Sequence, residues 1–148
     1  MYKVMLIDDE KSLHMAIEKL LTKSGYEYCG ATDAESGLEM LSAEKPDLLL
    51  LDEPFSALDY LTRVDMQEWL LHQWEYYHKT ILFITHDVEE AIFLSKTIYI
   101  IQDRPFSQME RVEVPLSYPR NREDLKRADI VELKETLIEK LRRSVMNP

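Results

Sequence analysis

The sequence predicts an α/β protein built on a parallel sheet with helical crossovers. Three observations predict it. Short apolar runs alternate with segments whose apolar residues recur at helical spacing, the central run shows no polar alternation, and several runs end in acidic or hydroxyl residues. A length of 148 residues is that of one domain, so we expect a single domain over residues 1–148.

The first three strands are predicted at residues 3–7, 26–31 and 48–51. Apolar residues at helical spacing lie between them and predict two intervening helices. Thr32 and Glu35 have the spacing of a capping box that opens the second of these helices. Consecutive leucines in the third run are typical of a central parallel strand that is covered on both faces.

The second half continues the alternation of strands and helices. Strands are predicted at residues 80–85, 97–102 and 111–114, the last of them a short antiparallel edge. Helices are predicted where Met66, Leu70, Trp74 and Tyr77 share one face, after the caps Asp87 and Glu90, and where Ile130, Leu133, Leu137 and Leu141 recur. The aromatic helix around Trp69, Trp74, Tyr76 and Tyr77 is expected to pack in the core.

Composition excludes several classes of protein. The formal net charge of −10 disfavours nucleic acid and anionic membrane surfaces as partners. No apolar run approaches the roughly 20 residues of a membrane span, so we expect a cytoplasmic protein with no membrane partner. Cys29 is expected to be a small core residue. The basic residues Arg120, Arg122, Lys126 and Arg127 alternate with acidic ones, which predicts a solvated segment.

Acidic residues gather where the predicted strands end. Asp8 and Asp9 follow the first strand, and Asp52 and Glu53 follow the third. Carboxyl ends of parallel strands meet at one edge of a sheet, and two carboxylates about 5 Å apart there repel by roughly 3 kcal/mol. Such a cluster binds a cation, takes up a proton or splays apart. We expect weak Mg²⁺ binding at Asp8, Asp9 and Asp52, and no required cofactor.

Residues 1–52 resemble the first half of a response regulator receiver domain, which has a flavodoxin-like fold. The resemblance is carried by the acidic pair Asp8-Asp9, the strand-helix order and the segment KPDLLLLD that ends at Asp52. It implies a three-layer α/β/α structure with strand order 2-1-3-4-5, Mg²⁺ at the three aspartates and Asp52 as phosphoacceptor. Thr85 ends the fourth predicted strand and Arg104 follows the fifth, at the places where this family carries its switch Thr or Ser and its lysine.

Residues 48–148 instead resemble the second half of an ATP-binding-cassette (ABC) transporter ATPase, of the nitrate, sulfonate or taurine importer type. LLLLDEP is similar to a Walker B strand, SALD (residues 56–59) to a D-loop and ITHDVEEA (residues 84–91) to the switch-histidine segment. The resemblance implies that Asp52 orders Mg²⁺, Glu53 polarises the attacking water and His86 contacts the γ-phosphate. The family belongs to the P-loop NTPases.

The departures from the ATPase pattern determine what activity we expect. A phosphate-binding loop needs G-x-x-x-x-G-K-[ST], yet Gly25, Gly30 and Gly37 precede no such lysine. No LSGGQ-type signature precedes the Walker B strand either. We therefore expect no ATP hydrolysis, with Glu53 and His86 as vestigial catalytic residues and no bound nucleotide cofactor.

Two unrelated families that meet inside one strand form the pattern that deliberate recombination of fold fragments leaves. The sequence thus favours an engineered chimera with no evolved catalytic function and no obligatory partner. Two alternatives stay open: a phosphoacceptor switch that works through Asp52, and a natural truncated transporter ATPase. We expect strand 97–102 to pair beside strand 80–85, or else a homodimer that forms by strand swapping.

Overall fold

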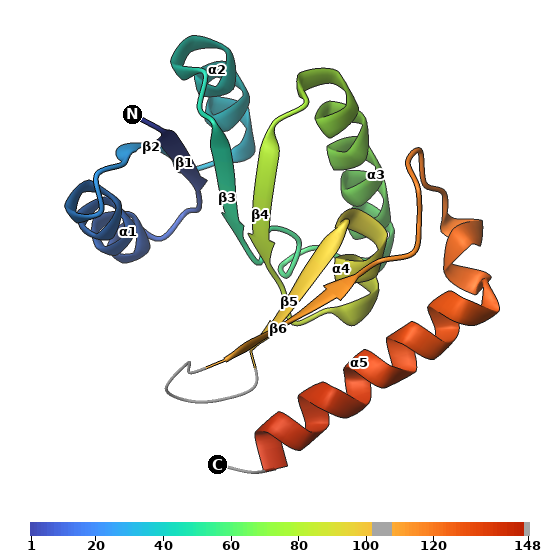
Figure 1. The fold of residues 1–148 in the computed structure, drawn as a ribbon. Coiled ribbons are helices and arrows are strands. Elements are labelled where there is room, and N and C mark those ends of the chain that lie inside the picture. Colours follow the sequence, from blue (N-terminus) through green and yellow to red (C-terminus); the bar gives the residue numbers. More distant parts are fainter. Residues whose placement is uncertain (102–107, 147–148) are drawn as a thin grey trace. The chain divides into compact units, whose positions relative to one another are not determined.

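The N-terminal part of the chain forms a parallel four-stranded sheet with the order β2-β1-β3-β4 (Figure 1). The computed structural model describes residues 1–101 and 108–146. The strands are β1 (Lys3–Ile7), β2 (Glu27–Ala31), β3 (Leu48–Asp52) and β4 (Thr80–Ile84), and they are joined by the helices α1 (Lys11–Lys23), α2 (Ala34–Glu44) and α3 (Tyr60–Tyr77). The predicted α/β class and the order of the first four strands are confirmed.

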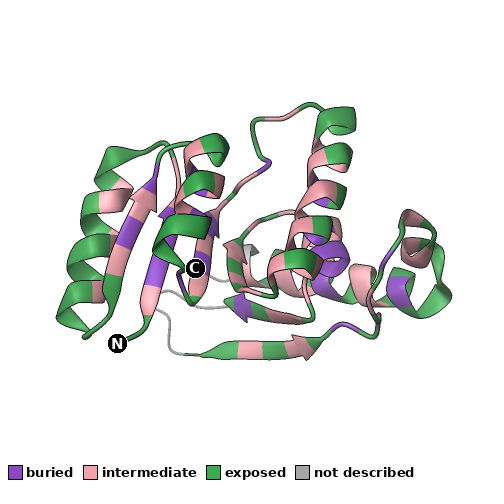
Figure 2. Cartoon of the chain, turned by 90° about the horizontal axis from the view of Figure 1, so that it is seen from above, coloured by how far each residue is buried: buried purple, intermediate pink, exposed green. Residues whose placement is uncertain are grey.

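Helices lie on both faces of this sheet, as the three-layer prediction requires. On one face, Met5, Cys29 and Ala31 form a buried cluster against Met40 of α2. Side chains alternate along a strand, so Tyr28 points to the opposite face, where its hydroxyl meets the imidazole of His14 from α1. Figure 2 shows buried residues on strands of this sheet, and they belong to β1, β2 and β3, whereas β4 has none.

β3 is paired with a parallel strand on each edge. Its backbone is in register with β1 from Val4↔Leu48 to Ile7↔Leu51. On the other edge it is in register with β4 from Leu48↔Thr80 to Asp52↔Ile84. The strand in which the two sequence resemblances meet is therefore a continuous member of one sheet.

The chain divides into two compact units, residues 1–85 and 86–148, where the sequence predicted one domain. The second unit holds α4 (Val88–Leu94), β5 (Thr97–Ile101), β6 (Met109–Glu113), a 3₁₀ turn η1 (Arg122–Lys126) and α5 (Ala128–Met146). Its core is a cluster of aliphatic residues: Ile92, Ile100, Val114, Leu116, Ile130 and Leu137.

The predicted fifth parallel strand is wrong. β5 pairs with β6 in a separate antiparallel sheet, with register from Thr97↔Glu113 to Ile101↔Met109. The physical reason is local, because Ile100 is buried in the core that β5 shares with α5, and the strand finds its hydrogen-bonding partner a few residues further along the chain.

The prediction that Arg120 is solvated is also wrong. Its guanidinium is buried and donates hydrogen bonds to the carbonyl oxygens of Ile92, Phe93, Ser95 and Leu116 at 2.8–3.1 Å. Tyr118 stacks on it, 4.1 Å from ring centroid to the guanidinium carbon. Arg122 is half-buried, with its guanidinium carbon 3.9 Å from the ring centroid of Phe93. Lys126 and Arg127 do lie at the surface, where they pair with Glu123 and Asp129.

Candidate functional site

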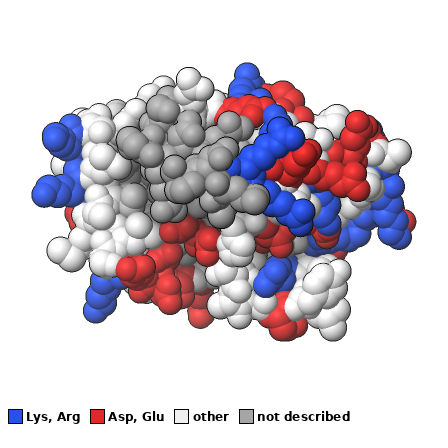
Figure 3. All heavy atoms as spheres, turned by 90° about the horizontal axis from the view of Figure 1, so that it is seen from below, with Lys and Arg blue, Asp and Glu red and all other residues white. Residues whose placement is uncertain are grey.

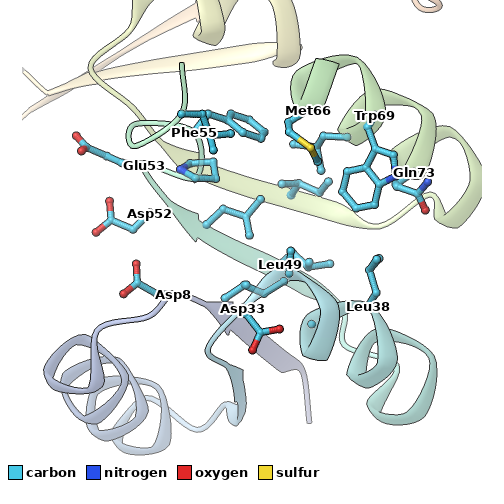
Figure 4. A pocket seen from close by; sticks show the side chains of 18 of the residues that line it. Asp8, Asp33, Leu38, Leu49, Asp52, Glu53, Phe55, Met66, Trp69 and Gln73 are labelled. Atoms are coloured by element: carbon cyan, nitrogen blue, oxygen red, sulfur yellow. The ribbon is translucent and has the colours of Figure 1, made fainter. Parts of the chain in front are cut away.

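The site is the carboxyl edge of the parallel sheet in the first unit. β1 and β3 are adjacent and parallel, so the residues that end them arrive side by side. Asp8 directly follows β1, and Asp52 is the last residue of β3. Figure 4 shows their carboxylates next to each other and turned to the same side, with Glu53 beside Asp52. The sequence-based prediction that these acidic side chains share one edge is therefore correct for Asp8, Asp52 and Glu53.

At this edge the ionised form of the Asp52 carboxyl is destabilised. Partial burial is the main cause that raises the pKa of its carboxyl above the ordinary value, and the negative charges of Asp8, Glu53 and Glu10 add to it. Asp8 has a fixed orientation, because its Oδ1 accepts a hydrogen bond of 2.7 Å from the backbone N–H of Glu10. A cation or a proton at Asp52 relieves the repulsion between these carboxylates.

The loop after β3 is held by the backbone. Glu53 adopts a left-handed conformation with φ of 42°, which is uncommon for a residue with a side chain. Its N–H donates to the carbonyl oxygen of Ile84 at 2.8 Å, so the turn is tied to the end of β4. The side chain of Glu53 is exposed at the rim.

A cavity of about 840 Å³ opens beside the acidic edge and runs between the sheet and α3. Its apolar wall comes from α2, β3 and α3: Leu38, Leu41, Leu49, Leu51, Met66, Trp69, Leu70, Trp74 and Tyr77. The predicted helical face of α3 exists, but it lines this space and is not close-packed core. In α3 only Gln67 and Leu71 are buried. Periodicity identified the face, and no signal in the sequence showed that the space in front of it is open.

The three predicted metal ligands are not assembled into one group. Among the residues that the structure describes, no set of three or more His, Cys, Asp or Glu side chains is placed to hold a metal ion. Asp9 is exposed, whereas Asp8 and Asp52 are half-buried and adjacent. Mg²⁺ accepts one or two carboxylates and keeps several waters, so this pair suits a weak site of that kind.

The remaining predicted site residues are Thr85, His86 and Arg104. Thr85 follows β4 and is the last residue of the first unit, while His86 begins the second unit. Arg104 lies outside the described residues. Ile84 is in register with Asp52, so Thr85 lies at the same carboxyl edge of the sheet as Asp52, although it does not line the cavity.

The charged surface is mixed in sign. On the face drawn in Figure 3, Lys and Arg side chains lie among Asp and Glu. No helix in the described ranges 1–101 and 108–146 is long and apolar enough to cross a membrane.

Comparison with known proteins gives two different kinds of similarity. The model of the response regulator receiver domain family matches residues 4–96, more than half of the chain. Curated ATP-binding proteins match the C-terminal half. The aliphatic sulfonates import ATP-binding protein SsuB of Bacillus anthracis is 51% identical over 77 residues, which are 52% of this chain and 31% of that protein.

An ATP-binding protein of Brucella abortus is 47% identical over 78 residues, which are 53% of this chain and 30% of that protein. The chain thus spans about a third of the length of these relatives. Among solved structures, a receiver domain protein from Clostridium thermocellum is 17% identical with a TM-score of 0.49, and covers 99% of this chain and 98% of its own.

Proposed function

Because this chain belongs to the response regulator receiver family, we propose that it is a receiver-based fold chimera, made by deliberate recombination, whose second half derives from an ABC transporter ATPase and does not hydrolyse ATP. The receiver-derived fragment is residues 1–52 and the ATPase-derived fragment is residues 48–148. One observation carries the proposal: the segment common to both, β3, pairs in register with β1 on one edge and with β4 on the other.

The missing phosphate cradle supports the absence of turnover. Backbone N–H groups of a glycine-rich loop and its lysine bind the β- and γ-phosphates in P-loop enzymes, and the 148 residues contain no G-x-x-x-x-G-K-[ST] segment. LLLLDEP then forms a Walker B strand without a triphosphate to act on. In that setting Glu53 has no positioned water and phosphate, and His86 has no γ-phosphate to contact.

Phosphate release from ATP and Mg²⁺ by the purified chain tests this proposal, with Glu53→Gln as the matched control. We expect the same background rate for both. Phosphate release by the unsubstituted chain that depends on Mg²⁺ and is lost in Glu53→Gln would overturn the proposal.

A second candidate function is phosphoacceptor chemistry at Asp52, and one geometric observation favours it. Asp52 ends β3 at the acidic edge and faces Asp8 (Figure 4). In the proposed step an oxygen of the Asp52 carboxylate attacks the phosphorus of acetyl phosphate. The phosphorus–oxygen bond to the acetyl group breaks and acetate leaves. Mg²⁺, when bound, would neutralise the phosphoryl oxygens, and Asp8 and Asp52 would hold it.

Intact-mass spectrometry after treatment with acetyl phosphate and Mg²⁺ tests the second candidate. We expect a single adduct of about 80 Da on the parent chain and on Glu39→Gln, an exposed acidic residue away from the edge. The adduct should be absent in Asp52→Asn. An adduct that persists in Asp52→Asn, or none on the parent chain, would exclude Asp52 as the acceptor.

A further inference from the structure

We propose that the cavity between the sheet and α3 is a binding site for an elongated apolar amine, with the ammonium group at the acidic edge. The inference goes beyond the proposed function, because neither the phosphoacceptor step nor the loss of ATP hydrolysis uses the apolar part of this space; Asp8 and Asp52, at its acidic end, are shared with the phosphoacceptor step.

Size and lining suit a small ligand. Ligand sites in proteins occupy about 300–1,000 Å³ and combine apolar walls with a few polar groups, and this cavity measures about 840 Å³. Leucine side chains from α2 and β3 face the indoles of α3 across it. The lining runs from Asp52 at the carboxyl end of β3 to Lys79 just before β4. A strand of five residues extends about 17 Å, which is longer than an extended decyl chain of roughly 13 Å.

Charge is distributed unevenly along the cavity. Four aspartates line it: Asp8, Asp9, Asp33 and Asp52. In Figure 4 the carboxylates of Asp8 and Asp52 lie at one end, and Trp69 and Gln73 lie at the other. Among the described lining residues the single basic one is Lys79, which precedes β4 and so lies at the opposite edge of the sheet from Asp52.

Asp33 adds a negative charge to the cavity and takes no part in the proposed phosphoacceptor step at Asp52. Its side chain caps α2 by accepting a hydrogen bond of 2.8 Å from the N–H of Ser36, and this bond is the main cause that lowers the pKa of its carboxyl. It therefore stays ionised near neutral pH. A cation is attracted to this end of the cavity and an anion is repelled, which selects an amine over a fatty acid of the same length.

The two tryptophans of the chain, Trp69 and Trp74, both line the cavity, so intrinsic fluorescence reports on its occupancy. The experiment titrates the parent chain with decylamine, decan-1-ol and decanoate, which share one apolar tail and carry positive, neutral and negative heads. We expect saturable changes, with decylamine about tenfold tighter than decanoate at low ionic strength and this ratio reduced in salt.

Matched variants separate the apolar and the charged contributions. Asp33→Asn keeps the helix cap and removes the charge, so it should weaken decylamine about two- to fivefold and leave decanol unchanged. Glu39→Gln on the same helix does not line the cavity and should change neither. Leu38→Phe narrows the space and should weaken all three ligands.

Three outcomes would overturn the proposal, and none requires a variant to fold. They are the absence of a saturable response to all three compounds, equal affinity for the three heads, and tighter binding of decanoate than of decylamine. The phosphoacceptor proposal is tested separately, because Asp33→Asn should leave the acetyl phosphate adduct on Asp52 intact.

Discussion

The two compact units differ in how completely their apolar side chains are packed. In the second unit six aliphatic residues form one buried cluster, and the buried Arg120 binds four backbone carbonyls around it. In the first unit the backbone of β3 is paired on both edges, yet a cavity of about 840 Å³ lies against it, compared with about 290 Å³ for a cavity in the second unit.

This difference teaches that backbone pairing and side-chain packing are separate requirements. In our proposal the second unit comes from one parent, so its side chains remain with the neighbours for which they were selected. The first unit contains the junction, where α2 comes from one parent and α3 from the other. Hydrogen bonds between strands do not depend on side chains, whereas close packing depends on their shape and volume.

The largest effect on stability should come from Arg120→Ala, which disrupts the well-packed second unit. Removing the guanidinium leaves four buried carbonyls without their donor, so we expect a loss of about 3–5 kcal/mol in the free energy of unfolding. Urea denaturation followed by circular dichroism measures it. Arg143→Ala, which removes an exposed i,i+4 pair with Glu139, is the control and should cost about 0.5 kcal/mol or less.

In the first unit, truncating a leucine in the packed region should lower the free energy of unfolding more than truncating a leucine that faces the cavity. Leu6 is fully buried in β1, so Leu6→Ala should cost about 2–5 kcal/mol. Leu70 faces the cavity, so Leu70→Ala removes fewer contacts and should cost about 1 kcal/mol. The measurement is the same denaturation experiment. Equal losses at the two positions would show that the cavity is closed in solution.

Asp52→Asn should stabilise the first unit at neutral pH, by about 1 kcal/mol or less after solvent screening. The pKa of Asp52 is higher in the folded chain, so the protonated form favours folding. Its favourable contribution is complete below the pKa of the unfolded chain and is lost as the pH rises through the folded pKa. The gain from Asp52→Asn should therefore be present at pH 7 and absent at pH 3.

Adding Mg²⁺ to the same denaturation experiment tests whether Asp52 helps to bind a cation. Mg²⁺ at pH 7 should raise the denaturation midpoint of the parent chain and leave that of Asp52→Asn unchanged, because it replaces the repulsion at the acidic edge with attraction. A stabilisation by Mg²⁺ of equal size in both chains would place the cation elsewhere.

The smallest effect should come from Leu82→Thr. Leu82 lies on β4 and is 49% exposed, on the sheet face opposite the cavity. We expect a change of about 0.5 kcal/mol or less, because about half of the side chain stays in water in the folded chain and threonine, which is β-branched, favours a strand. A loss comparable to that of Leu6→Ala would reveal that this face is covered in solution.

The sequence predicted the local elements of the first unit better than their packing. Strands of consecutive apolar residues were placed within about one residue, because a buried parallel strand has few alternatives. Asp87 was confirmed as the cap of α4, its side chain accepting from the N–H of Glu90. The cap of α2 is Asp33 and not the predicted Thr32, since both residue types cap helices and only the geometry distinguishes them.

What the sequence could not predict depends on contacts between distant residues. The pairing of β5 with β6 was missed, because an apolar run in the sequence does not determine which neighbouring strand it pairs with. The burial of Arg120 was missed as well, because its charged neighbours indicated a solvated segment. The acidic edge was predicted, since chain order and parallel pairing alone bring Asp8 to Asp52, but the convergence of Asp9 was not confirmed.

Leu48–Asp52 has a consequence for how folds exchange parts. A strand inside a parallel sheet offers separate hydrogen-bonding partners to its left and right neighbours, and these two sets of peptide groups do not interfere with each other. A short run of leucines that ends in an aspartate can therefore join segments from two protein families whose remaining sequences are unrelated. Crossovers between such lineages should be tolerated most often inside interior strands of this type.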